Sequence, residues 1–160
     1  MNKTYKIFFL LATGCFALLF HIGCGQHLPD GMPPIYPCKI TFTQEGKPVF
    51  NASVILHPVV QSDKYWAISS VSDVNGVTML STNGNYKGVP AGTYKVTVEK
   101  ILPEAQGSKG YYLVDSIDIQ YRSVDTTPIQ VEVNTNKKQN VFSFDLGKET
   151  QTRVSQLIED

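Results

Sequence analysis

The side chains that could do chemistry in this sequence are few, and the histidines come first. His27 and His57 are the two histidines beyond the N-terminal 23 residues, and no His-Glu-x-x-His pattern includes either. A catalytic zinc site needs three protein ligands, so this pair predicts none. Serine nucleophiles lack a Gly-x-Ser-x-Gly turn, and no pair of carboxylates is placed for glycoside hydrolysis. These residues therefore predict neither an enzyme nor a bound cofactor or metal.

Aromatic side chains form a second group of candidates. Trp66 lies beside Tyr65 in a segment that is expected to be a strand, where one of two neighbours must face outward. Tyr111 and Tyr112 lie in the stretch 102–120, which is long for a hairpin connection and contains two glycines. Long loops often carry recognition, and aromatic rings stack on sugars or pack against proteins. Trp66, Tyr111 and Tyr112 are the candidate binding residues, and covering the ends of the domain is their alternative role.

Cys24 is the third candidate, for covalent attachment of lipid. It follows an Ile-Gly pair, which resembles the end of a bacterial lipobox, where a small residue precedes the cysteine that becomes the acylated N-terminus. His21 stands where Leu is usual. Cys15 is a second candidate, but its acylation would leave the apolar stretch 16–22 exposed in the mature chain, which is unfavourable in water. The sequence predicts lipidation, palmitate included, at Cys24; an unmodified cysteine in a signal tail is the alternative.

Residues 1–23 have the pattern of a secretory signal peptide. Lys3 and Lys6 form a positive n-region, and 7–20 is an apolar stretch. A signal anchor that stays in the membrane is the alternative, but a spanning helix needs about 20 apolar residues and this run is shorter. Removing the segment leaves 12 basic side chains against 14 acidic ones. Attachment then depends on the lipid, because two or more acyl chains bind stably and a weak net charge adds no attraction to anionic lipid.

Cys38 is left alone once the signal peptide is removed and Cys24 is the anchor. No internal disulfide is therefore expected. A single thiol at the start of a predicted strand is most often a small buried hydrophobe, and a reactive thiol needs a nearby base or cation. We interpret Cys38 as a core residue.

The composition of the chain excludes several classes of protein. The 160 residues include 14 Lys+Arg and 14 Asp+Glu, and 42% are apolar while 18% are charged. This length and apolar fraction suit one domain with a core. The low charged fraction is unlike that of disordered or coiled-coil chains. The lack of a basic excess argues against nucleic-acid binding.

A spacer followed by strands must position these candidates. The segment 25–37 contains four prolines and two glycines, which predicts a semi-rigid tether. From Cys38 onward apolar residues recur with a period of two, which predicts strands. The predicted strands are 38–43, 52–58, 64–72, 77–82, 93–100, 129–133 and 142–146.

The connections follow from turn residues. Asn75-Gly76 predicts a hairpin between the third and fourth strands, and Asp73 to Gly76 lacks the alternating oxygen ligands of a calcium loop. The tail from Lys148 has weak helical spacing that we expect to fray. Seven strands without sustained helical spacing predict an all-β fold, a single antiparallel seven-stranded β-sandwich. The predicted organisation is a signal peptide at 1–23, a tether at 24–37, the sandwich at 38–146 and a tail at 147–160.

Several stretches resemble one known family. They are 46–49, 52–54, 72–77, 89–96, 121–128 and 140–146. Over residues 36–146 the sequence resembles a carboxypeptidase-regulatory-like (transthyretin-like) domain, and in particular small bacterial lipoproteins of planctomycete type that carry this domain after a lipobox. The resemblance implies a transthyretin-like or Ig-like sandwich. It implies no catalytic residues, because the matching positions are turn and core residues and the domain is similar to a folding or positioning module.

The sequence as a whole predicts a non-enzymatic lipoprotein of the cell envelope. We expect it to be held in a membrane, at the periplasmic or cell-surface face, through lipid on Cys24. The sandwich is expected to act as a binding or structural module for an envelope protein, by strand-edge pairing or loop contact. The alternative is a carbohydrate-binding module that recognises a glycan with its exposed aromatic rings. An enzyme is the third and least supported hypothesis.

Overall fold

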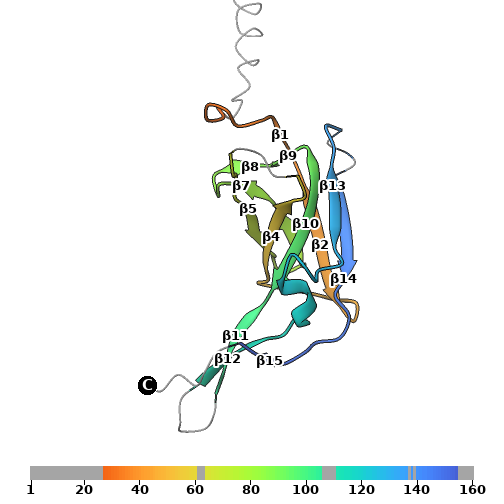
Figure 1. Ribbon diagram of the computed structural model, residues 1–160. Helices are drawn as coiled ribbons and strands as arrows, with labels where there is room; N and C mark the ends of the chain where they lie inside the picture. Colours follow the sequence, from red (N-terminus) through yellow and green to blue (C-terminus); the bar gives the residue numbers. More distant parts are fainter. Residues whose placement is uncertain (1–26, 61–63, 106–110, 137, 139, 155–160) are drawn as a thin grey trace, which may run out of the picture.

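The computed structural model describes residues 27–60, 64–105, 111–136, 138 and 140–154 (Figure 1). These residues form strands and one short 3₁₀-helix, η3 (Ile119–Arg122). The strands are β1 (Ile35–Tyr36), β2 (Lys39–Gln44), β3 (Lys47–Pro48), β4 (Ser53–Pro58), β5 (Ile68–Val71), β6 (Val77–Met79), β7 (Ser81–Thr82), β8 (Tyr86–Lys87), β9 (Val89–Pro90), β10 (Gly92–Glu99), β11 (Ile101–Ala105), β12 (Tyr111–Asp115), β13 (Gln130–Val133), β14 (Val141–Asp145) and β15 (Thr152–Arg153). The prediction of an all-β fold is confirmed.

Two sheets enclose the core. The larger has the strand order β13-β10-β4-β5-β7-β8, and the smaller has the order β14-β2-β3, with β6 also paired to β2. Alternation along each strand buries one set of side chains, such as Ile40 and Phe42 on β2 and Val54 and Leu56 on β4. Burying one such side chain contributes roughly 1.5–3 kcal/mol. The period-two pattern in the sequence therefore marks the faces that form the core of the sandwich.

The structure has more strands than the seven that the sequence predicts. Each predicted range overlaps a strand of the sandwich. The additional strands are β11 and β12, with five residues each, and β1, β3, β8, β9 and β15, with two residues each. Alternation cannot be recognised over two residues. These short pairings depend on neighbours that lie close only in the folded chain.

One strand pair at the edge of the smaller sheet is parallel, so the prediction of a fully antiparallel sandwich is wrong there. β14 runs beside β2 with Val141 opposite Lys39 and Asp145 opposite Thr43. The chain reaches β14 directly from β13 in the facing sheet. Asn140 fixes this crossing, because its side-chain amide accepts from the N–H of Asn134 (2.8 Å) and donates to its carbonyl (2.8 Å). Because the crossing lies at the end where β2 begins, β14 starts there too and runs in the same direction.

The Asn75-Gly76 turn joins two sheets, so the predicted hairpin forms only in part. The second half of the returning strand pairs antiparallel with β5, with Ile68 opposite Thr82, but its first half does not. β5 pairs with β4 and β7, whereas β6 pairs with β2 in the smaller sheet. The carboxylate of Asp73 shapes the turn by accepting from the N–H groups of Asn75 (2.8 Å) and Val77 (2.9 Å). Gly76 has a φ of 72°, and a Cβ there would overlap the carbonyl oxygen of Phe42. Glycine is needed for both reasons.

The predicted strand 77–82 changes sheet in its middle. Leu80 separates β6 from β7 and is 2% exposed. Its N–H donates to the carbonyl of Cys38 (3.1 Å) and its carbonyl accepts from Gly88 (3.0 Å). One buried leucine thus links the two layers of the sandwich.

Part of the predicted tether packs on the sandwich. β1 pairs with β9, with Ile35 opposite Pro90. Met32 is buried, and its N–H donates to the carbonyl of Pro29 (3.0 Å). The prolines of this segment hold an extended path without donating hydrogen bonds. Residues of the predicted tether therefore contribute to the fold before Cys38.

One extension leaves the sandwich. β10 continues past Lys100 into β11, β12 returns antiparallel to β11, and β15 pairs with β12. We call these three strands the arm; Figure 1 shows it projecting at the end of the sandwich opposite to β1. The predicted long loop 102–120 is therefore mostly a hairpin followed by η3, and the tail from Lys148 supplies a strand where weak helical spacing was predicted.

Candidate functional site

Cys24, the predicted lipidation site, lies outside the described residues. Cys38 is 1% exposed and lies in the apolar core. Burial raises the pKa of its thiol to about 12, and a thiol that stays protonated is neither a nucleophile nor a metal ligand. The interpretation of Cys38 as a core residue is confirmed.

Trp66 and Tyr65 lie before β5, so the predicted strand 64–72 is wrong for its first four residues. β5 begins at Ile68. The residue before it, Ala67, donates to Oδ1 of Asn83 (3.1 Å), and the N–H of Asn83 donates back to the Ala67 carbonyl (2.7 Å). Tyr65 is 69% exposed and Trp66 is half-buried. Both rings therefore reach the surface from a short segment tied to the β7–β8 turn.

Tyr111 and Tyr112 begin β12 in the arm. Both are half-buried, and they lie opposite Ala105 and Glu104 of β11. The guanidinium carbon of Arg153, on β15, lies 3.9 Å from the centroid of the Tyr112 ring. A cation over an aromatic face is attracted by the ring quadrupole. The tail strand thus holds the Tyr112 ring in place.

The three candidate residues do not form one surface. Lys64, two residues before Trp66, packs against Gly31, which precedes β1. Trp66 therefore lies near the β1 end of the sandwich. Tyr111 and Tyr112 lie in the arm, at the opposite end (Figure 1).

The base of the arm contains a buried polar network that the sequence did not reveal. Asp115 is fully buried, and its Oδ1 accepts from the N–H groups of Lys100 (3.0 Å) and Ile117 (2.9 Å). Its Oδ2 lies 3.4 Å from Nε of Arg122, which also lies 3.6 Å from Oε2 of Glu99. We call Asp115, Arg122 and Glu99 the junction. Neither Oδ2 of Asp115 nor Nε of Arg122 has a hydrogen-bond partner among the described residues, so the contact between them is an ion pair. The two N–H bonds to Oδ1 are directional, and they fix how the arm leaves the sandwich.

Two further segments attach to the junction through Ser116. Its carbonyl accepts from Nε2 of Gln44 (3.0 Å) on β2 and from the N–H of Thr150 (3.0 Å) in the tail. These residues are far apart in sequence and follow no motif. No sequence pattern could have identified the cluster, because only the fold brings its members together.

His57 pairs with a hydroxyl. Its Nε2 lies 2.9 Å from Oγ1 of Thr97, on the neighbouring strand of the larger sheet. Partial burial lowers the pKa of this imidazole. An imidazole beside a hydroxyl is the geometry of a base and a nucleophile, but Thr97 is 6% exposed and is closed to a substrate. Within the described ranges, no three His, Cys, Asp or Glu residues are grouped to hold a metal ion.

The part of the chain that the structure describes has no helix long and apolar enough to cross a membrane. Two surfaces of the described residues carry the candidate side chains, the aromatic residues near β1 and the arm at the opposite end. Comparison of the chain with protein-family models, with curated proteins and with solved structures finds no match.

Proposed function

We propose that this chain is a non-enzymatic lipoprotein of the cell envelope that presents a β-sandwich to a protein partner. In this proposal Cys24 carries the lipid, and the arm is the contact surface. The observation that carries it is the position of the arm, which lies at the end of the domain opposite to the end where the chain arrives from Cys24 (Figure 1). A module anchored at one end and binding at the other keeps its two attachments apart. The resemblance to a carboxypeptidase-regulatory-like domain agrees with such a positioning role.

The exposed apolar residues of β11 support a protein contact. Ile101 is 38% exposed and Leu102 is 37% exposed, on a strand that lies outside the sandwich. As neighbours on a strand they face opposite sides of the arm, so each side of the arm presents apolar surface. Tyr111 and Tyr112 lie on the neighbouring strand, and aromatic rings are enriched where proteins meet.

The backbone of β11 favours side-chain contact over strand addition. Ser116 donates to the carbonyl of Lys100 (3.1 Å), so Leu102 and Glu104 direct their backbone groups toward β12. Pro103 therefore lies on the open edge, where it has no N–H to donate. A proline at this position interrupts pairing with an added strand. We infer that a partner contacts the side chains of the arm.

Metabolic labelling tests the lipid anchor. The full chain, made in its own cells with an alkyne analogue of palmitate, is expected to carry the label, and Cys24→Ala is expected to lose it. Cys38→Ala is the matched control and keeps the label, since the thiol of Cys38 is buried. Labelling that persists in Cys24→Ala contradicts the site, and loss in Cys15→Ala alone assigns it to Cys15.

Site-specific crosslinking tests the arm. A photoreactive amino acid at Leu102 of the full chain is expected to trap a defined envelope protein. The control position is Ser69, which is exposed on the larger sheet. The same adducts from both positions, or none from Leu102, would contradict the proposal.

Carbohydrate binding is the second candidate, favoured by the adjacent Tyr65 and Trp66. Tyr65 is well exposed, and a pair of rings at the surface suits stacking on a sugar. A glycan array probed with the wild type and with Trp66→Ala decides this. Binding lost in a correctly folded Trp66→Ala variant supports it, and no signal with the wild type rejects it.

A further inference from the structure

Most of the described charged residues of the domain lie near one of its two ends. Strand direction places the starts of β2, β10 and β14, and the end of β4, at the β1 end. Among the described residues, that end carries Lys39, Lys64, Lys87 and Lys138 against Asp30 and Glu132. The opposite end, with the arm, carries Glu45, Asp73, Glu99, Glu104, Asp115, Asp118, Asp145 and Glu149 against Lys47, Lys100, Arg122, Lys148 and Arg153. The whole chain has equal numbers of basic and acidic side chains. Its described residues nevertheless have a net positive charge at the β1 end and a net negative charge at the end with the arm.

The basic end also carries exposed apolar and aromatic side chains. Val59 is 52% exposed, Val60 is 81% exposed, and Tyr65 is 69% exposed. The N–H of Val59 donates to the carbonyl of Thr93 (3.0 Å) near the start of β10, which places this residue at the β1 end. We call Val59, Val60, Lys64, Tyr65 and Trp66 the anchor face.

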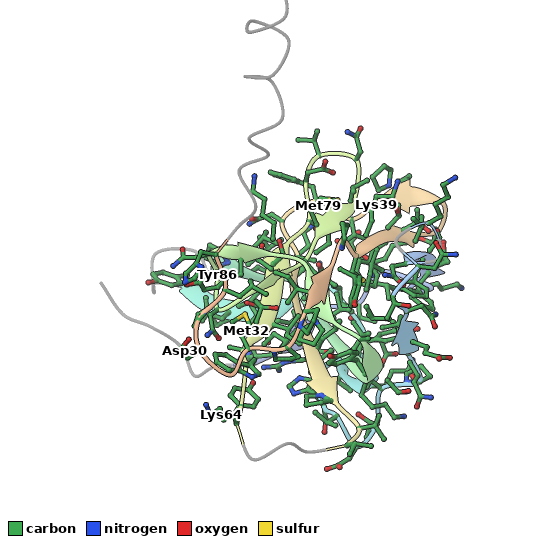
Figure 2. The ribbon with its side chains drawn as sticks, turned by 90° about the horizontal axis from the view of Figure 1, so that it is seen from above. Asp30, Met32, Lys39, Lys64, Met79 and Tyr86 are labelled. Atoms are coloured by element: carbon green, nitrogen blue, oxygen red, sulfur yellow. The ribbon has the colours of Figure 1, made fainter. Side chains whose placement is uncertain are left out.

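Figure 2 looks down on this end of the domain. It shows Lys64 on the same side as Asp30 and Met32, which belong to the segment that arrives from the N-terminus. The packing of Lys64 against Gly31 agrees with this view. The anchor face therefore borders the point where the chain enters the domain.

The chain between Cys24 and the domain is short. Met32, which is buried, lies eight positions after Cys24. A fully extended chain spans about 3.5 Å per residue, so this link reaches about 28 Å at most. If Cys24 is acylated, Met32 stays within that distance of the bilayer, and Lys64 of the anchor face packs against the residue before it.

We propose that the anchor face rests on the surface of the bilayer that holds the lipid of Cys24. This inference depends on the proposed acylation. Tyrosine and tryptophan prefer the headgroup level of a membrane, and valines next to them enter the boundary with the acyl chains. The lysines of this end face anionic headgroups, which attract them over about one Debye length. The arm and the acidic end then point away from the membrane, toward a partner.

The fluorescence of Trp66 tests this orientation, since it is the only tryptophan of the chain. The full acylated chain is reconstituted in vesicles of phosphatidylethanolamine and phosphatidylglycerol, with or without brominated acyl chains. Bromine quenches tryptophan only at close range, so we expect loss of Trp66 emission in the brominated vesicles. Flotation is measured on the same samples. A chain that does not float contradicts the lipid anchor, whereas a chain that floats with unchanged emission overturns the orientation.

Paired variants sharpen the test. Val60→Glu with Tyr65→Glu changes two exposed side chains of the anchor face and is expected to reduce quenching while flotation persists. The matched control is Phe50→Glu with Val74→Glu, at the opposite end, where the side chains are 52% and 70% exposed. The control is expected to be quenched like the wild type. Equal quenching in both pairs of variants overturns the proposal. A change of Trp66 emission that soluble glycan causes and vesicles do not cause also overturns it.

Discussion

The core of the sandwich and Asp115, in the junction at the base of the arm, are both buried, but opposite kinds of contact stabilise them. Ile40, Phe42 and Leu56 are fully buried between the sheets, and the ring of Phe42 stacks on Phe144 with centroids 6.2 Å apart. Asp115 is equally buried, yet it is surrounded by N–H groups and a guanidinium. Apolar burial is non-directional, whereas a buried carboxylate needs each of its partners. Apolar burial in the core therefore stabilises the folded chain, and the polar contacts of the junction set the direction of the arm.

The largest effect is expected from Phe42→Ala in the core. Removing this ring loses the transfer free energy of its buried atoms and leaves a cavity, so the free energy of unfolding should fall by about 3–5 kcal/mol. Urea denaturation measures the loss. Phe50→Ala, at an exposed phenylalanine, is the control and should change stability by about 0.5 kcal/mol or less. Similar losses in the two variants would remove the contrast between core and surface.

Alkaline pH should also weaken the core, through Cys38. Its pKa is raised from 9.0 to about 12 in the folded chain. A raised folded pKa gives stability that is present below pH 9 and is lost as pH rises toward 12. By pH 11 the thiol accounts for about 3 kcal/mol of lost stability. Tyr94, whose pKa is also raised to about 12, adds to the loss above pH 10.

Cys38→Ala isolates the thiol. Stability of the variant should fall less steeply between pH 9 and pH 11 than that of the wild type, as measured by urea denaturation at each pH. The comparison uses the slope with pH, because the substitution also leaves a small cavity. If the free energy of unfolding falls with pH equally steeply in the wild type and in Cys38→Ala, ionisation of the thiol does not destabilise the fold.

In the junction, Asp115→Ala is expected to cost about 2–3 kcal/mol, since it leaves two buried N–H groups and Arg122 without their carboxylate. Hydrogen exchange should rise first in β11 and β12, before it rises in β2 and β4. Asp115→Asn keeps an oxygen for the N–H groups of Lys100 and Ile117 and should lose less. A uniform rise across the sandwich would show that core and junction unfold as one unit.

The smallest effect is expected at the end of the arm, from Arg153→Ala. This change removes the cation over the ring of Tyr112, which contributes about 0.5–1 kcal/mol at a surface site. The measurement is the rate of hydrogen exchange at the amide of Tyr112, which should rise in Arg153→Ala. Arg153→Lys keeps a cation, so its exchange rate should lie between those of the wild type and Arg153→Ala. A loss as large as that of Asp115→Ala would place Arg153 within the junction.

The sequence predicted the sandwich better than it predicted the candidate site. Ile40, Val96 and Val98 alternate with polar residues, and all three are buried as the pattern indicates. Tyr111 and Tyr112 were assigned to a loop because the residues before them contain glycine and proline and lack alternation. Their hairpin forms because β10 continues outward and β15 pairs with β12. That pairing joins residues about forty positions apart.

By itself the sequence determined the all-β class, the inward faces of the main strands and the buried state of Cys38. Each of these depends on side-chain polarity at neighbouring positions, which is local information. Only the tertiary structure decided that β14 runs parallel to β2, that Asp115 meets Arg122, and that a chain of balanced charge has a basic end and an acidic end. These features depend on which strands pair and in which direction they run, and long-range contacts set both.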